Sequence, residues 1–148
     1  MLRMRRITDQ GFVVLAHFIV RGGDGLLTAR AISEELGLPP ATAAKVLKAL
    51  QRGGLLRSTR GLCGGYSLAC DPASTTVVDV IEAMEGPLTL TECSVDGVVN
   101  CDTHESCHLA GTWPAVNKAV IGALQGVTLL DLVADRMPQS TPVVTQVG

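Results

Sequence analysis

The chain has 148 residues, five cysteines and a net charge of −2, a length that fits one domain or one small domain with an appendage. Apolar residues make up 47% and aromatic residues only 3%, which favours an aliphatic, helix-biased core. No apolar run is long enough to span a membrane. No small-residue cleavage site follows the basic start Met1–Arg6, so a cytoplasmic protein without a secretory signal is expected.

The small net charge hides an asymmetry between the two halves. Residues 1–70 hold ten Lys/Arg against four Asp/Glu, a net charge of +6, and residues 71–148 hold two against ten, a net charge of −8. A basic front half indicates a polyanionic partner, because neutralising phosphates supplies most of the non-specific affinity for nucleic acid. A merely solvated charged surface is the alternative interpretation.

Three helices are expected in the basic half. Thr8 is placed to cap the first, whose apolar residues recur every three or four positions. Thr28 is placed to cap the second, which Gly37 ends. Pro39-Pro40 opens the third, where a missing N–H costs little, and Gly53-Gly54 stops it. The inward, apolar face of this third helix is predicted to be Ala43, Val46, Leu47 and Leu50. The second and third helices, joined by a tight turn, resemble a helix-turn-helix.

A basic hairpin follows directly. Residues 55–60 are predicted to form one strand and residues 66–68 its partner, around a glycine-rich tip. The predicted fold class is therefore mainly α, a winged helix-turn-helix with a small β-hairpin wing. The candidate DNA contacts are Thr42 and Lys45 for base edges, Lys48, Arg57 and Arg60 for phosphate or the minor groove, and Tyr66 for the wing or the DNA backbone. Solvent-facing charges are the alternative for each.

Two further helices and a short last one are expected after the wing. Thr76 and Asp79 form a capping-box pattern, and Thr128 is placed to cap the last helix. Between them, Pro114 opens a long helix with one apolar stripe, formed by Val116, Ala119, Val120, Ala123, Leu124 and Val127. So small a chain leaves little to bury that stripe against, so a homodimer interface is predicted. Packing on its own domain is the alternative.

These elements predict a division of the chain into four parts. Residues 1–86 form the winged helix-turn-helix domain and residues 87–111 a cysteine-rich loop. Residues 112–136 hold the dimerisation helix and the short terminal helix, and residues 137–148 a disordered tail.

Three cysteines fall within 15 residues of the loop, with the spacing Cys93-x7-Cys101-x5-Cys107. A loop rich in Gly, Asn, Asp and Ser does not bury thiols in a core, and it presents them together, as a soft metal or an iron–sulfur cluster requires. Zinc sites usually show tight C-x2-C pairs. The wider spacing therefore favours a [2Fe–2S] or [4Fe–4S] cluster, with zinc and free thiols as alternatives.

Three thiolates leave one ligand position open. His104 and His108 lie nearby, and Asp9, in the DNA-binding half of either subunit, is a remote candidate. An acidic residue in a first helical turn more often compensates the helix dipole. Cys63 and Cys70, in and beside the wing, are interpreted as non-ligands.

Taken together, these segments resemble the Rrf-type regulators, the IscR/NsrR family of iron–sulfur winged-helix transcription factors. The resemblance covers residues 4 to about 136 and rests on ITDQGFVVLAHF, LTARAISEELGLPPATAAKVLKALQRGGLL, RGLCGGYSL, VVDVIEAMEG, the three cysteines and TLLDLV. It implies a homodimer crossed by the long C-terminal helix. It also implies one cluster per subunit, held by Cys93, Cys101 and Cys107.

The resemblance also bears on the fourth ligand. IscR-type members use a histidine three residues after the last cysteine, where this chain has Ala110. NsrR-type members use the aspartate of an N-terminal TD pair from the other subunit, which Thr8-Asp9 matches. The opening ITDQG looks most like the branch that regulates SUF cluster-assembly operons. The wing departs from the common GxGGGY-like form at Leu62-Cys63.

The resulting hypothesis is a homodimeric repressor or dual regulator that binds a double-stranded DNA operator and senses iron–sulfur status. A nitric-oxide or redox sensor of the same fold is one alternative, and a zinc- or thiol-based regulator is another. An electron carrier or enzyme is disfavoured, because the sequence shows no acid–base constellation or nucleotide loop and the helix-turn-helix half would have no purpose.

Overall fold

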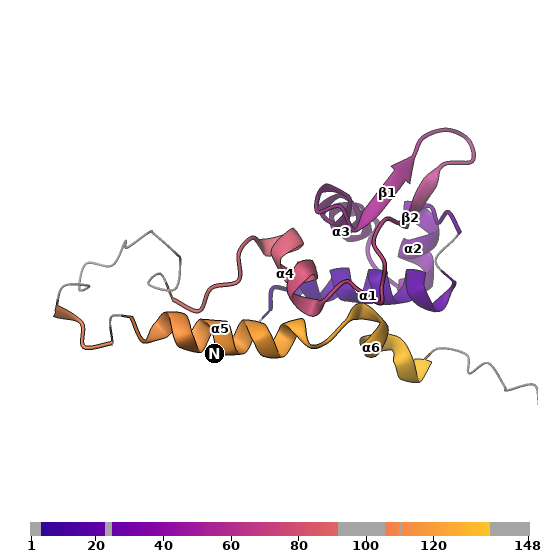
Figure 1. The fold of residues 1–148 in the computed structure, drawn as a ribbon. Coiled ribbons are helices and arrows are strands. Elements are labelled where there is room, and N and C mark those ends of the chain that lie inside the picture. Colours follow the sequence, from indigo (N-terminus) through magenta and orange to yellow (C-terminus); the bar gives the residue numbers. More distant parts are fainter. Residues whose placement is uncertain (1–3, 23–24, 92–105, 110, 137–148) are drawn as a thin grey trace, which may run out of the picture.

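The computed structural model describes residues 4–22, 25–91, 106–109 and 111–136 (Figure 1). Within these ranges, no helix is long and apolar enough to cross a membrane. The elements in chain order are α1 (Arg6–Val20), α2 (Ala29–Leu36), α3 (Pro40–Arg52), β1 (Leu56–Thr59), β2 (Gly65–Leu68), α4 (Val77–Glu85), α5 (Trp113–Gln125), α6 (Leu129–Val133) and the 3₁₀ helix η3 (Ala134–Arg136). The mainly α winged-helix prediction is confirmed.

The core lies where α1, α2 and α3 meet. The apolar face predicted for the third helix is buried in it, and so are the central residues of α1: Val14, Leu15, Phe18, Ala43, Val46, Leu47 and Leu50. Thr28 caps α2 by accepting a hydrogen bond from the backbone N–H of Ala31 at 3.1 Å. Gly37 ends α2 with φ of 63°, a left-handed conformation that favours glycine. Both predicted ends of the second helix are therefore confirmed.

The wing is a two-stranded antiparallel hairpin, with Leu56 opposite Leu68. It is also bonded to the segment before α2. The backbone N–H of Leu27 donates to the Tyr66 carbonyl at 2.9 Å, and the Tyr66 N–H donates to the Leu27 carbonyl at 2.8 Å. A Cβ on Gly65 would lie 2.8 Å from the Leu27 carbonyl oxygen, so glycine is needed for this close approach. In Figure 1 the hairpin extends away from the helices, next to α3.

The starts of α4 and α6 lie side by side. Each begins with a capping box: Thr76 with Asp79, as predicted, and Thr128, the predicted cap, with Asp131. Thr76 and Thr128 also pair in an antiparallel bridge. Leu129 of α6 is buried in the same core as α1, so the last helix is packed against the DNA-binding half.

Helix α5 is poorly covered by its own chain. Its buried residue is Asn117, 7% exposed, whose side-chain oxygen accepts a hydrogen bond from the Leu90 N–H at 3.0 Å. Within the predicted apolar stripe, Val116 is 41% exposed, and Ala119 and Ala123 are exposed as well. The described structure therefore does not bury these three residues against the chain's own domain.

Candidate nucleic-acid interface and cluster site

The outer face of α3 carries the residues predicted to read bases. Lys45 and Lys48 are exposed on the side of the helix opposite the buried face, and Thr42 is half-buried at the edge between the two. Because the apolar side anchors α3 in the core, these three polar side chains are held on one surface. This arrangement suits a helix that enters the major groove.

The wing is fixed to the end of that helix. The Gln51 side chain at the end of α3 donates to the Ser58 hydroxyl of β1 at 2.9 Å. The wing tip is a tight turn in which the Gly64 N–H donates to the Gly61 carbonyl at 3.0 Å, and Gly61 has φ of 118°. A Cβ on Gly64 would lie only 2.3 Å from the Thr59 carbonyl oxygen. The tip therefore has a defined shape, and the hydrogen bond between Gln51 and Ser58 joins the wing to α3.

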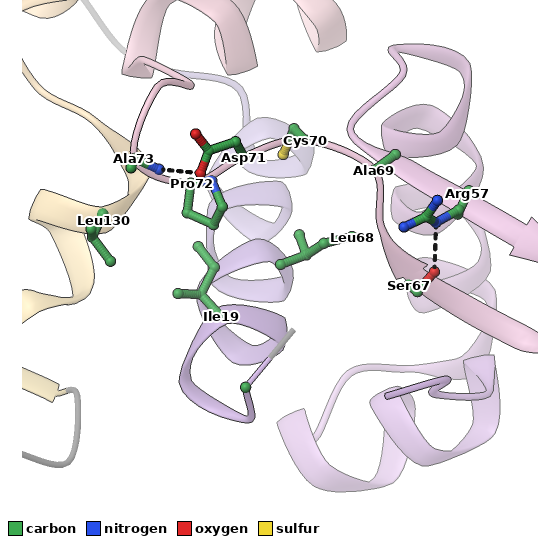
Figure 2. A pocket seen from close by; sticks show the side chains of 11 residues that line it. Ile19, Arg57, Ser67, Leu68, Ala69, Cys70, Asp71, Pro72, Ala73 and Leu130 are labelled. Atoms are coloured by element: carbon green, nitrogen blue, oxygen red, sulfur yellow. Dashed lines mark hydrogen bonds between the residues drawn. The ribbon is translucent and has the colours of Figure 1, made fainter. Parts of the chain in front are cut away.

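The three wing residues predicted to contact DNA differ in their surroundings. Arg60 is exposed beside the tip, and Tyr66 is half-buried against the core. Arg57 is exposed on β1, and its Nε donates to the Ser67 hydroxyl across the hairpin at 3.2 Å. Figure 2 shows Arg57 turned toward Ser67 at the edge of a pocket. Arg60 is thus the freer of the two arginines.

The pocket in Figure 2 lies at the base of the wing and has a volume of about 610 Å³. Its walls come from the wing strands, from residues 69–73 directly after β2, from Ile19 on α1 and from Leu130 on α6. Cys70 lines it and is half-buried. Burial raises the pKa of the Cys70 thiol, with a hydrogen bond to Thr75 acting in the opposite sense. A raised thiol pKa disfavours the thiolate that binds metals, in keeping with the interpretation of Cys70 as a non-ligand.

The start of α1 is held by a contact that the sequence did not indicate. Thr8 is fully buried and donates its hydroxyl hydrogen to Glu85 Oε1 at 2.5 Å. The Arg5 N–H donates to the same oxygen at 3.2 Å, and Arg5 Nε lies 3.6 Å from Glu85 Oε2. The prediction that Thr8 caps the helix is wrong, because α1 begins at Arg6. Glu85 ends α4, so this contact fixes α1 to the segment that leads into the cysteine loop.

Replacing Thr8 by valine is expected to lower the free energy of unfolding by about 1–3 kcal/mol, because the hydrogen bond to the Glu85 carboxylate is lost. Urea denaturation followed by circular dichroism measures the change. The matched control is Thr59→Val on the exposed strand β1, which should change stability by less than about 0.5 kcal/mol. Equal stabilities for the two variants would contradict a structural role for the Thr8 hydroxyl.

The predicted metal ligands are only partly within the described structure. Cys93, Cys101 and His104 lie outside the described residues. Cys107 is described and is a half-buried free thiol, and His108 is exposed. Among the described residues alone, no three His, Cys, Asp or Glu side chains come together in a group that could hold a metal ion.

The donors that are described are chemically suited to an iron–sulfur centre. The Cys107 thiol is not in a disulfide. Asp9 is exposed in the first turn of α1, and no ion pair involves it among the described residues. A free thiol and an uncommitted carboxylate fit the predicted ligand set. Figure 1 shows the start of α5, just after Cys107, well away from α1 of the same chain.

The chain is similar in sequence and in structure to known transcriptional regulators. The model of the Rrf2 family, described as an iron-dependent transcriptional regulator, matches residues 4–135. The HTH-type transcriptional repressor NsrR of Streptomyces coelicolor is 30% identical over 134 residues, which are 90% of this chain and 89% of the repressor. The structure of IscR from T. potens is 25% identical with a TM-score of 0.64, covering 95% of this chain and 92% of that one.

A second solved structure resembles the chain in fold. CymR, the global cysteine regulator of B. subtilis, has a TM-score of 0.67 at 24% identity, covering 91% of this chain and 98% of that one. At this identity the likeness supports the winged-helix architecture alone.

Proposed function

The chain belongs to the Rrf2 family of transcriptional regulators, and we propose that it is a homodimeric repressor that senses iron–sulfur cluster status. Family membership makes it a DNA-binding regulator. The genes that we propose it controls are those of iron–sulfur cluster assembly, and the cytoplasm is the proposed location. The opening ITDQG supports this choice of target genes.

The observation that carries the DNA-binding part is the shared surface of α3 and the wing. We assign base-edge contacts to Thr42 and Lys45 of α3. Lys48, Arg57 and Arg60 are assigned to phosphate or the minor groove, and Tyr66 to support of the wing. The hydrogen bond between Gln51 and Ser58 supports this division, because it keeps the base-reading helix and the wing in one orientation.

The proposed cluster ligands are Cys93, Cys101 and Cys107 together with Asp9 of the partner subunit. The separation of α1 from the start of α5 within one chain supports the partner's carboxylate over the chain's own. An iron–sulfur centre supplies a group whose assembly or loss reports iron and oxidant status. The ligands themselves would join the loop before α5 of one subunit to α1 of the other.

The exposed stripe of α5 supports the homodimer. Val116, Ala119 and Ala123 leave an apolar face that a second copy of the helix would bury. A two-fold dimer presents two winged helices at a fixed separation, and the separation of the half-sites in an operator is a geometric requirement. Ligands that join the subunits therefore provide a physical route from cluster status to operator affinity.

A thiol-based regulator is the second candidate, and one observation favours it. Cys63 is an exposed free thiol at the wing tip, beside Leu62. Chemical modification of that thiol would add bulk and charge to the surface proposed to face DNA. Such a sensor would need no metal.

Anaerobic purification followed by iron and sulfide analysis and visible absorption spectroscopy distinguishes these candidates. The expected result is near-equal iron and sulfide with charge-transfer bands, and these would also give the cluster type. Zinc, or no metal after reconstitution with iron and sulfide, would overturn the cluster proposal in favour of the thiol or zinc regulator. Asp9 would then lose its assigned role.

A further inference from the structure

A second pocket lies between the start of α1 and the start of α3. Its volume is about 510 Å³, and it is lined by Arg6, Ile7, Gln10, Pro39, Ala41, Thr42 and Lys45. Arg6 and Gln10 lie one helical turn apart on α1, so their side chains share one face of that helix. Thr42 and Lys45 are likewise one turn apart on α3. The pocket thus joins polar side chains of two helices that are distant in sequence.

The pocket is lined by two positively charged side chains that no carboxylate neutralises among the described residues. Among the described residues, no ion pair involves Arg6 or Lys45, although Arg5, Arg21 and Arg30 are each paired with a glutamate. No carboxylate lines the pocket. Two free cations with two neutral hydrogen-bonding side chains, one an amide and one a hydroxyl, form a site suited to a phosphate group.

The position of the pocket identifies the source of the phosphate. Thr42 and Lys45 line the pocket and also lie on the face of α3 assigned to base reading. DNA that places its bases against this face must carry its sugar–phosphate backbone past the same helix.

We propose that Arg6 and Gln10 bind a backbone phosphate of the operator, so that the first turns of α1 belong to the DNA interface. The inference rests on the proposed function and extends it to residues outside the helix-turn-helix and the wing. Lys45 forms the opposite wall of the pocket. The phosphate is held by charge-assisted hydrogen bonds from the Arg6 guanidinium and by the Gln10 amide.

This contact has a consequence for regulation. Asp9, the proposed cluster ligand, lies on α1 between Arg6 and Gln10 in sequence. The helical turn that would engage the cluster is therefore the same turn that would hold the DNA backbone. A shift of this turn when the cluster is gained or lost would change the phosphate contact directly. This effect would add to any change in the separation of the two winged helices.

The first test is the salt dependence of DNA binding by full-length Arg6→Gln protein. The probes are a 30-bp duplex selected from a randomised pool by the wild-type protein, and a duplex of unrelated sequence. The slope of log K against log salt should fall in magnitude by about 0.9 per lost phosphate contact. Affinity at low salt should fall roughly tenfold for both duplexes. Arg136→Gln removes an equal charge from the exposed end of η3 and should leave the slope unchanged.

A second measurement locates the contact. Single methylphosphonate linkages, which remove one phosphate charge at a time, are placed along the selected duplex. One position in each half-site should weaken wild-type binding and leave Arg6→Gln binding unaffected. A variant with wild-type affinity and slope, or equal losses for both proteins at every position, would overturn the inference while operator binding stood. Failure of the selection to enrich any duplex that the wild-type protein binds would instead overturn the proposed function.

Discussion

Replacing Cys107 by serine is expected to abolish cluster binding while the winged helix stays folded. A serine hydroxyl does not ionise near neutral pH and is a poor ligand for iron, so the proposed site keeps two thiolates of three. The fold should survive because Cys107 lies outside the hydrophobic core formed by α1, α3 and their neighbours. Iron and sulfide per chain should fall to less than about a tenth of wild type, with the charge-transfer bands lost.

Two matched variants give this experiment its controls. Cys63→Ser changes an exposed thiol at the wing tip, and Cys70→Ser changes a half-buried thiol that lines the pocket at the base of the wing. Both should retain iron and sulfide. The operator affinity of Cys107→Ser should no longer respond to iron chelation. Full iron and sulfide in Cys107→Ser would remove it from the ligand set, and loss of cluster in Cys63→Ser would transfer the sensing role to the wing.

Local patterns were sufficient for most of the secondary structure. The capping box at Thr76, the cap at Thr128 and the glycine stop at Gly37 are short-range signals whose hydrogen bonds form within one helical turn. The buried face of α3 followed from its helical period. These features require no knowledge of distant contacts, which explains why the sequence was enough to predict them.

Thr8 shows where such patterns stop being informative. A threonine before an apolar helical repeat resembles a cap, yet its hydroxyl bonds to Glu85, 77 positions away. The pocket shared by Arg6 and Lys45 arises in the same way, from two helices packed against one another. Neither the hydrogen bond nor the pocket leaves a local signal in the sequence. For the ligand set, Cys93 and Cys101 lie outside the described residues, so their role stays a prediction.

Placing two glutamates on the α5 stripe, Val116→Glu with Ala119→Glu, is expected to dissociate the homodimer. Both side chains are exposed in the single chain, so the substitutions should not disturb its own core. In a two-fold interface each change occurs twice, so four carboxylates would be brought together in an apolar contact. A monomer binds one half-site at a time, so operator affinity should fall roughly 100-fold or more.

Sedimentation velocity gives the oligomeric state, and a gel-shift titration on the selected duplex gives the affinity. The control is Lys118→Glu with Gln125→Glu, which adds carboxylates to the exposed positions of α5 opposite the stripe. That variant should remain dimeric and bind the operator far more tightly than the stripe variant. Because the proposed cluster takes Asp9 from the partner subunit, the monomeric variant should also bind iron more weakly. A stripe variant that sediments as a dimer would place the interface elsewhere on the molecule.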